Sequence, residues 1–254
     1  VLNSNAYIFI EKPLSHNHNK IEEIIKKEKY KNQNRIYIGY QFRFHPCVIK
    51  TKEYLENGYL GNIVNSNLVH GEYLPDWHKY ENYKNSYAAK KELGGGALLT
   101  LIHEFDMIIN FFSMPKKLFA IGGHLSSLDL NVEDSVQILM QCRQKNKVFP
   151  VSVTLDYLTW PPKKEYFING DKGSIFCDLI KNKFSFANRE SREINVENFC
   201  DFDRNDMFLS QIKHFIEVSE SKCAPMVDIK TAYKSLKIAL AAKESMKTGI
   251  IERI

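Results

Sequence analysis

The sequence has no glycine-rich phosphate-binding turn, since the pattern G-x-G-x-x-G occurs nowhere in its 254 residues. Dinucleotide-binding strand–turn–helix units use that pattern to bring the backbone close to a pyrophosphate. The adenosine half of a dinucleotide therefore has no recognisable site in this sequence. Cofactor binding by the chain alone becomes an open question.

Cysteine is scarce and scattered. The five cysteines stand far apart, with no C-x-x-C spacing. That pattern excludes the disulfide framework of a small secreted domain, so we expect reduced thiols. We also expect no metal site.

Long apolar runs and blocks of one charge are missing as well. No apolar run approaches the ~20 residues that span a bilayer, and residues 1–5 lack the pattern of a signal peptide. The net charge of +5 comes from lysines scattered along the chain rather than merged into one basic stripe. We therefore expect a cytoplasmic protein with neither a membrane nor a nucleic acid as partner.

The first 45 residues predict one parallel crossover unit. Residues 6–10 form a short apolar run typical of a buried strand, and residues 36–40 form a second. Between them, Ser15 precedes a helical pattern with isoleucines at 21, 24 and 25. A two-stranded parallel sheet leaves most of its apolar faces wet. We therefore expect partners from outside this sequence, and association of the chain without them.

The remaining residues predict an open, mainly antiparallel sheet with helices on one face, which gives an α/β (α+β) fold class. A helix is expected from Pro46 to Gly58, and a single buried helix over 97–112. Period-2 alternation predicts most of the strands. The expected strands are 63–73, 118–126, 135–142, 148–155, 165–169 and 174–179. Two helices close the chain, one through Met207 and Ile216 and one over 229–247.

Lys12 is the first candidate for chemistry. It precedes Pro13, which keeps it out of the helical region at the carboxyl end of a strand. Ligands of open parallel sheets bind at that edge, and partial burial would lower the pKa of a lysine enough to move a proton. A lysine that merely extends from a strand end to solvent is the alternative.

His103 is the second candidate. It lies on a helix that must be buried, where a neutral imidazole exchanges protons near neutral pH. Asp106, one turn later, is expected to orient the ring. The glycines 94–96 would let backbone approach a ligand before the helix begins. A core histidine satisfied by hydrogen bonds and a flexible helix entry are the alternatives.

The segment 74–93 is rich in aromatic residues with polar tips. Trp77, His78 and Tyr87 would suit a carbohydrate or nicotinamide face. Equally, the loop's own rings would pin it to the sheet. Tyr157 and Trp160 follow a predicted strand and are expected near the same cleft.

Four motifs occur in a specific order. They are residues 10–15 (IEKPLS), 39–46 (GYQFRFHP), 73–78 (YLPDWH) and 94–106 (GGG through HEFD). In this order and spacing the chain resembles the glucose-fructose oxidoreductase, inositol dehydrogenase and MocA family. The resemblance covers nearly every residue of this chain but about the last two thirds of a typical member.

The resemblance implies two domains. Residues 1–45 would be the remnant of a Rossmann dinucleotide-binding domain, and residues 46–254 an α/β domain that binds substrate and forms a homo-oligomer through its open sheet. The C-terminal helix would pack back on the first domain. Family members transfer hydride between NAD or NADP and a carbon of a sugar, sugar derivative or cyclitol.

The resemblance also implies roles for residues. Lys12 and His103 match the catalytic positions. The cofactor positions are Glu11, Lys12, Pro13, Gln41 and Arg43. The substrate positions are Trp77, His78, Lys84, Tyr87, Thr100 and Tyr157.

Two residues depart from the family pattern. Thr100 stands where aspartate is usual, and Lys84 stands where a loop arginine is common. Two hypotheses follow. The chain is an NAD(P)-dependent oxidoreductase present as a fragment or shortened form, or it is a non-catalytic sugar-binding or oligomerisation module that retains the fold.

Overall fold

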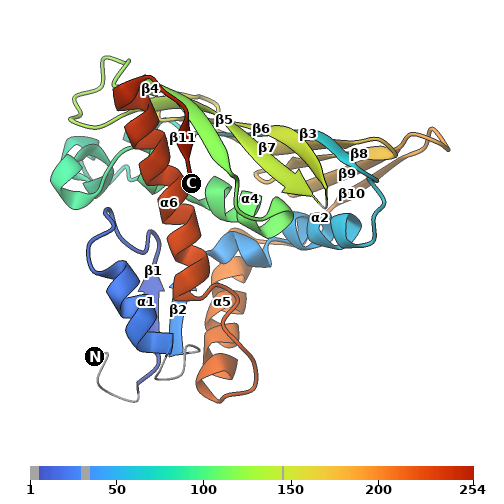
Figure 1. Ribbon diagram of the computed structural model, residues 1–254, viewed down its shortest axis with the longest axis horizontal. Coiled ribbons are helices and arrows are strands. Elements are labelled where there is room, and N and C mark those ends of the chain that lie inside the picture. The colour runs from blue at the N-terminus through green and yellow to red at the C-terminus, as the bar shows by residue number, and fades with distance from the viewer. Residues whose placement is uncertain (1–5, 30–34, 145) are drawn as a thin grey trace.

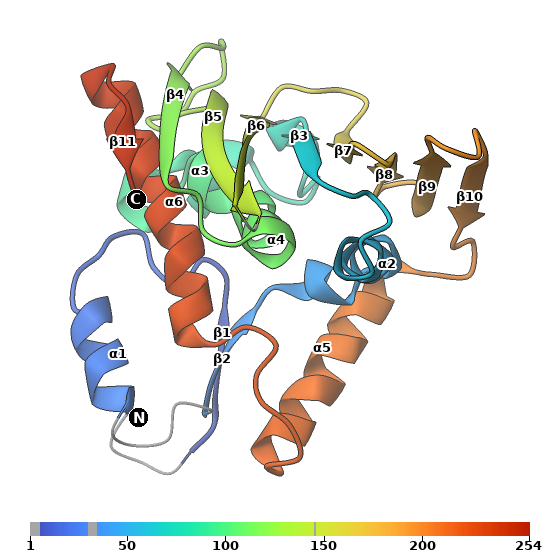
Figure 2. The ribbon, with the colours of Figure 1, turned by 45° about the vertical axis from the view of Figure 1, so that its right-hand side comes forward.

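The computed structural model describes residues 6–29, 35–144 and 146–254. A large sheet forms one layer, and helices α2 (Pro46–Glu56), α4 (His103–Phe112) and α6 (Ile229–Thr248) lie against one of its faces (Figure 1). A small two-stranded sheet lies beyond the helices, on the side away from the large sheet (Figure 2). The predicted α/β class, with one parallel unit followed by a mainly antiparallel sheet, is confirmed.

The parallel unit consists of β1 (Ile8–Glu11), α1 (Ile21–Lys29) and β2 (Ile36–Gly39). The two strands pair in parallel. All of β2 is buried and most of β1 is half-buried, so the expectation of largely wet faces needs correction.

The cover for this unit comes from the C-terminal half of the same chain. Helix α5 (Arg204–Ser219) brings the ring of Phe215 edge-on to Phe9 and Tyr37. The segment before α6 (Ile229–Thr248) forms an isolated antiparallel bridge between Asp228 and Tyr37, and the Val227 carbonyl accepts a hydrogen bond from the Ile38 N–H at 3.0 Å. Aromatic edge contacts and a third backbone partner thus replace the sheet neighbours expected from outside the sequence.

The large sheet has nine strands in the order β10-β9-β8-β7-β3-β6-β5-β4-β11. Neighbours are antiparallel except β3 and β6, which run parallel. The strands are β3 (Ile63–Gly71), β4 (Lys117–Gly123), β5 (Ser135–Gln144), β6 (Lys147–Asp156), β7 (Lys163–Gly170), β8 (Gly173–Asp178), β9 (Lys183–Asn188), β10 (Ile194–Asn198) and β11 (Glu252–Arg253). Strands β9, β10 and β11 lie outside the ranges expected from the sequence. Of these, β10 is mostly exposed at an edge and β11 has only two residues, so neither has a strong apolar pattern.

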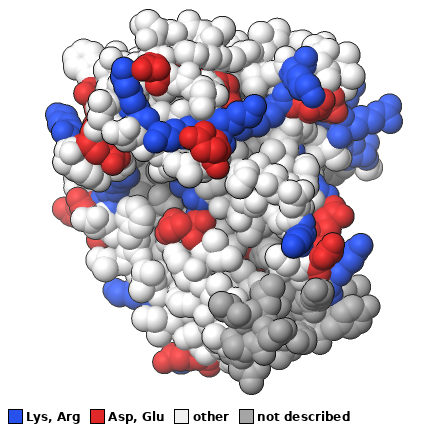
Figure 3. Space-filling model, turned by 90° about the vertical axis from the view of Figure 1, so that its left-hand side faces the viewer, with Lys and Arg blue, Asp and Glu red and all other residues white. Residues whose placement is uncertain are grey.

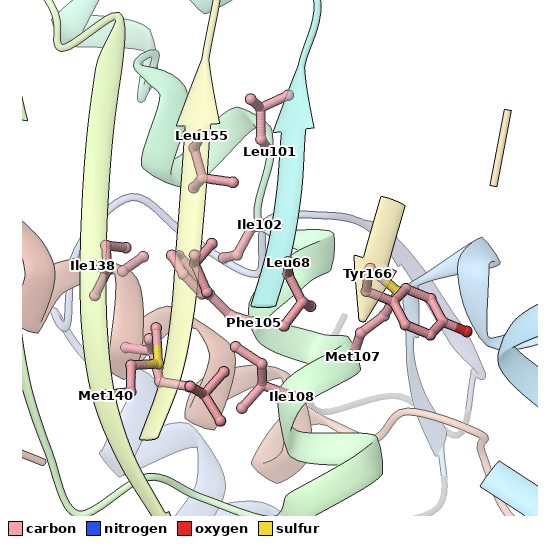
Figure 4. Close-up of a cluster of buried hydrophobic side chains, with 14 of the residues drawn as sticks. Leu68, Leu101, Ile102, Phe105, Met107, Ile108, Ile138, Met140, Leu155 and Tyr166 are labelled. Atoms are coloured by element: carbon pink, nitrogen blue, oxygen red, sulfur yellow. The ribbon is translucent and has the colours of Figure 1, made fainter. Parts of the chain in front are cut away.

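The helical layer is built from α2 (Pro46–Glu56), α4 (His103–Phe112) and α6 (Ile229–Thr248). Pro46 begins α2, as expected from its fixed φ, and Gly249 ends α6 in the left-handed region. Side chains of α4 pack against the inward faces of the strands (Figure 4). The figure labels Leu68, Leu101, Ile102, Phe105, Met107, Ile108, Ile138, Met140, Leu155 and Tyr166.

The single helix expected over 97–112 is two helices. Helix α3 (Ala97–Thr100) ends before Leu101, α4 begins at His103, and the helical segment Lys91–Thr100 lies at 46° to α4. In a continuous helix the Thr100 carbonyl would accept from the N–H four residues on. Here Lys12 Nζ donates to that carbonyl at 2.7 Å. A side chain from the parallel unit thus satisfies the carbonyl at the break and leaves His103 at the first position of a new helix.

No single helix among the described residues is long and apolar enough to cross a membrane. One bent pair of segments, Lys91–Thr100 with His103–Phe112, meets the length and composition of a membrane span, and no more than these two criteria. Most residues of α3 and α4 are buried beneath the sheet.

On the face drawn in Figure 3, basic side chains alternate with acidic and uncharged ones.

Candidate active site

A cavity of about 650 Å³ lies where the parallel unit, the helix break and the large sheet meet. The ends of β1, β3 and β7 contribute to its wall, as do the turn after β2 and the start of α5. Residues that line it include Glu11, Lys12, Gln41, Phe42, His45, His70, Glu72, Trp77, Thr100, His103, Lys163, Lys164, Asn182, Asp203 and Arg204.

Lys12 and His103 both line this cavity, although 90 residues separate them in the chain. The Lys12–Pro13 peptide bond is cis. Burial lowers the pKa of Lys12 to about 8, helped by the charge of Lys164 and opposed by Glu104 and Glu11. A lysine with that pKa is present in both charge states near neutral pH.

His103 is buried and keeps its neutral form. Burial lowers its pKa well below the usual range, and the charges of Lys12 and Lys164 lower it further. Its ring meets Phe42 edge-on, with centroids 4.9 Å apart. Within the described residues its Nδ1 has no hydrogen-bond partner. The ring lines the cavity, and its buried Nδ1 is left without a partner in the part of the chain that the structure describes.

The sequence predicts that Asp106 orients the His103 ring, but in the structure Asp106 has a different partner. Its two carboxylate oxygens accept hydrogen bonds from Arg43, at 2.6 Å from Nε and 2.8 Å from Nη2. The side-chain oxygen of Asn110, one turn later on α4, accepts a hydrogen bond from the third guanidinium nitrogen, Nη1. A bidentate pair between a planar fork and a carboxylate is stronger than a contact with a neutral ring, which explains the different partner.

Glu104, His70 and Lys164 form a second buried group of charged and titratable residues. Glu104 Oε1 is 3.0 Å from His70 Nδ1 and 3.2 Å from Lys164 Nζ. Burial alone would raise the pKa of Glu104, but His70 and Lys164 outweigh it and hold this pKa at about 2. Lys164 Nζ also lies 3.8 Å from the centroid of the Phe42 ring. The Phe42 ring thus contacts both His103 and Lys164.

The three glycines at positions 94–96 lie close to other residues of the chain and do not face the cavity. A Cβ on Gly95 would lie 2.5 Å from the carbonyl oxygens of Tyr87 and Ala88. Gly96 has φ +103° and packs against the Glu133 carboxylate. None of the three glycines lines the cavity. The close approach that glycine permits therefore fixes the entry to α3, where it was expected to serve a ligand.

The residues predicted to bind substrate are divided between the cavity and the surface. Trp77 and Thr100 line the cavity, and Tyr157 lies behind them. Tyr157 donates to Thr100 Oγ1 at 2.7 Å and meets the Trp77 ring edge-on at 5.4 Å. Thr100 Oγ1 itself donates to Gly96 O, so its hydroxyl serves the local fold.

The other predicted substrate residues lie outside this cavity. His78 is exposed and accepts from or donates to the Tyr80 hydroxyl at 3.2 Å. Lys84 is paired with Asp129 at 2.8 Å, and Tyr87 is partly exposed. Among the aromatic residues predicted to bind substrate, Trp77 lines the cavity, and the role of this segment towards a ligand stays a prediction. Trp160 is 73% exposed.

Among the predicted cofactor residues, Glu11 and Gln41 line the cavity with Lys12. The buried Gln41 Oε1 has no hydrogen-bond partner among the described residues. Pro13 is half-buried beside them. Arg43 is committed to Asp106 and Asn110, and its role towards a cofactor stays a prediction.

The sequence reading missed His70, Glu104 and Lys164. A signal for two of them was present. The inward-facing positions of β3 include Ser66, Leu68 and His70. In β7, Lys164 is the first inward-facing residue. A charged or titratable residue in the apolar phase of an alternating strand is unusual and marks a candidate site.

Comparisons with known proteins agree with this architecture. The myo-inositol 2-dehydrogenase of Thermotoga maritima is 24% identical over 252 residues, which is 96% of this chain and 71% of that protein. The structure of a levoglucosan dehydrogenase, in complex with NADH and levoglucosan, has a TM-score of 0.82 at 17% identity, covering 98% of this chain and 74% of that one. At this identity the likeness shows the fold alone.

A further solved structure and a family model complete the comparison. The WlbA dehydrogenase of Bordetella pertussis, in complex with NADH and UDP-GlcNAcA, has a TM-score of 0.78 at 17% identity and covers 100% of this chain and 73% of that one. The model of the GFO/IDH/MocA C-terminal domain matches residues 48–176, just over half of the chain. The resemblance expected from the motifs is confirmed, and the chain belongs to the GFO/IDH/MocA family.

Proposed function

We propose that this chain carries the substrate-binding and proton-transfer part of an NAD(P)-dependent oxidoreductase that acts on a carbon of a sugar, sugar derivative or cyclitol. The observation that carries the proposal is the presence of Lys12 and His103 in the wall of one cavity. The names of the relatives support it, since they include a cyclitol dehydrogenase and a sugar dehydrogenase bound to NADH. The chain would comprise a dinucleotide-domain remnant over 1–45 and the substrate domain over 46–254.

The roles of the two residues follow from their charge states. A general base works best when its pKa is near the working pH, and Lys12 meets that condition with a pKa of about 8. His103, held neutral, is a weaker base but a good hydrogen-bond partner for a hydroxyl. In the proposed reaction Lys12 accepts the hydroxyl proton, and His103 orients the hydroxyl.

The cavity residues fit the nicotinamide end of NAD or NADP. Glu11, Lys12 and Gln41 would hold it, because they lie at the carboxyl ends of the parallel strands. Gln41 Oε1, buried and unpartnered among the described residues, is an acceptor suited to a carboxamide N–H. When bound, the cofactor supplies the hydride acceptor or donor. No glycine-rich turn for its phosphates occurs in the 254 residues.

The test is binding and turnover. Calorimetric titration of the full protein with NAD⁺ and NADP⁺ is expected to show binding. Absorbance of the reduced nicotinamide is then expected to change with at least one member of a panel of myo-inositol, levoglucosan and D-glucose. Binding of a sugar without binding of either nucleotide would favour the non-catalytic module instead, an alternative that Thr100, in place of the aspartate usual in the family, supports.

The pH dependence of the rate is a separate prediction. Lys12 accepts a proton only in its neutral form, so the rate of hydroxyl oxidation should rise as the pH increases through about 8. In the reverse direction Lys12 donates a proton, and the rate should fall over the same range. Initial rates measured in both directions across this range check the sign. A rate of oxidation that falls as the pH rises would contradict the role given to Lys12.

We also propose that the chain forms a homo-oligomer through the helix-free face of the large sheet. Apolar side chains on this face remain exposed, among them Ile121, Leu139 and Val148. Two shallow hollows of about 330 and 560 Å³ lie between them. Large exposed apolar patches mark interaction sites.

Light scattering coupled to size exclusion checks this prediction. The wild-type chain is expected to elute as an oligomer, and Leu139→Glu is expected to shift it to the monomer because a charge would be buried at the contact. Leu209→Glu, an exposed leucine on α5, is the matched control. A monomeric wild-type chain would rule out the assembly.

A further inference from the structure

Helix α3 is too short to hold its own position. It has four residues, Ala97–Thr100, and a helix needs several turns before its internal hydrogen bonds outweigh the cost of forming the first one. The groups that bind its two ends therefore determine where it lies. Lys12, which the proposed reaction uses as the base, binds the carbonyl at the C-terminal end.

Glu133 binds the N-terminal end of α3. It lies in the loop between β4 and β5, and its backbone carbonyl accepts a hydrogen bond from the Ala97 N–H at 2.9 Å. Its carboxylate oxygen Oε1 accepts a hydrogen bond from the Leu98 N–H at 3.2 Å. The first N–H groups of a helix have no partner within that helix. Here one residue supplies the acceptor for two of them.

The Glu133 carboxylate is itself held from two sides. Its side chain is 10% exposed, and Lys243 Nζ of α6 lies 3.6 Å from Oε1. On the other side, the backbone of Gly96 is so close that a Cβ there would lie 2.3 Å from Oε1. The carboxylate thus contacts α6, the residue before α3 and the first turn of α3. Because these contacts fix the carboxylate, they also fix the start of α3.

The amine of Lys12 depends on the other end of this helix. Among the described residues, its hydrogen-bond partner is the Thr100 carbonyl, at 2.7 Å from Nζ. A neutral amine has two N–H groups and one lone pair, so a hydrogen bond from one N–H restricts the direction of the lone pair. A displacement of the carbonyl would therefore displace the group that accepts the proton. A misplacement of about 1 Å costs about 100-fold in rate.

We propose that Glu133 is a positioning residue: it holds α3 in place, and the Thr100 carbonyl at the end of α3 aims the Lys12 amine at the substrate hydroxyl. The inference rests on the proposed function for the role of Lys12 as the base, and it names the residue on which the placement of that base depends. Glu133 is absent from the described residues that line the cavity, so it acts through α3 and not on the ligand.

NMR of the full protein labelled with ¹³C at lysine Cε tests this placement without any reaction. The Lys12 signal, assigned by its loss in Lys12→Met, is expected to titrate near pH 8 in the wild type. A carbonyl acceptor favours the charged form of an amine. Glu133→Ala leaves the Leu98 N–H without its acceptor, so α3 is expected to move and the midpoint to fall below that of the wild type. The same midpoint in both proteins would overturn the inference.

Two conservative variants separate the reach of the side chain from its charge. Glu133→Gln keeps the length and an oxygen for the Leu98 N–H but loses the charge, and we expect it to recover the wild-type midpoint. Glu133→Asp keeps the charge but is one methylene shorter, and we expect its midpoint to fall as in Glu133→Ala. The reverse order would show an electrostatic effect and refute the positioning role. This pair decides the question even where Glu133→Ala does not fold.

The charged and titratable neighbours of Lys12 remain in every variant at position 133. These neighbours are Glu11, His103, Glu104 and Lys164. A shift of the Lys12 midpoint in these variants therefore reports a change in the position of the amine and not the loss of one of these groups.

Asp228→Ala is the matched control. The Asp228 carboxylate accepts a hydrogen bond from the Thr231 N–H at 2.7 Å at the start of α6, so this variant also removes an acceptor from a helix N–H. We expect it to lower the stability and to leave the Lys12 midpoint unchanged. An equal shift in Asp228→Ala and Glu133→Ala would show that loss of any such acceptor moves Lys12, and the inference would fail.

Kinetics connect the placement to the rate. Glu133→Ala is expected to lower kcat for hydroxyl oxidation by roughly 10- to 100-fold with little change in KM, and Glu133→Gln to restore most of the rate. A wild-type kcat in Glu133→Ala would contradict the positioning role. If the full protein shows no nucleotide-dependent turnover, the proposed function fails, and the lysine titration still decides whether Glu133 places Lys12.

Discussion

Replacing Lys12 with methionine is expected to lower kcat for hydroxyl oxidation by roughly 10²- to 10⁴-fold, the usual contribution of a positioned general base. Methionine keeps the length and apolar character of the side chain but has no proton acceptor. It also leaves the Thr100 carbonyl without the donor that the lysine provides. Initial rates at saturating substrate measure the effect, with a thermal melt to record the stability of the variant.

Lys12→Arg is the matched variant. Arginine keeps a positive charge and a donor for the Thr100 carbonyl, but it does not lose its proton in proteins. We expect the helix break to persist and the rate to fall nearly as far as in the methionine variant, without the rise near pH 8. An arginine variant with wild-type rates and pH profile would show that Lys12 is not the base.

The second large effect concerns stability. Asp106→Ala is expected to reduce the free energy of unfolding by about 3–5 kcal/mol, because it leaves the buried guanidinium of Arg43 without its counter-charge. The two side chains are 9% and 2% exposed, so water does not replace the lost partner. Urea denaturation followed by circular dichroism gives the change.

The double variant Arg43→Met with Asp106→Leu is the control. Removal of both charges leaves no unpaired ion, and buried pairs replaced by apolar residues of similar size are often as stable as the original. We expect the double variant to be clearly more stable than Asp106→Ala. If the single and double variants lose the same stability, the cost comes from packing, and the ion pair is not its source.

The sequence located Lys12 and His103 through local signals. Proline at position 13 constrains the residue before it, and an almost wholly apolar helix makes a histidine within it conspicuous. The same local reasoning assigned Asp106 to His103 because the two are one turn apart. It was wrong because Arg43, 63 residues away in the chain, offers a stronger pair.

The helix over 97–112 shows the same limit. Its composition favours one continuous helix, and nothing in those residues indicates a break. The donor that satisfies the free carbonyl comes from Lys12, 88 residues before Thr100. Likewise, the sequence does not predict that His70 and Lys164 are neighbours, because their contact depends on the register of two strands.

By itself the sequence determined most of the helices and strands, the α/β class and two residues at the cavity. These depend on side-chain periodicity and on proline and glycine, which act over a few neighbouring residues. The tertiary structure decided the ion pairs and the break before His103. Each of these arises between residues far apart in the chain, where packing and strand register determine which partner a polar group meets.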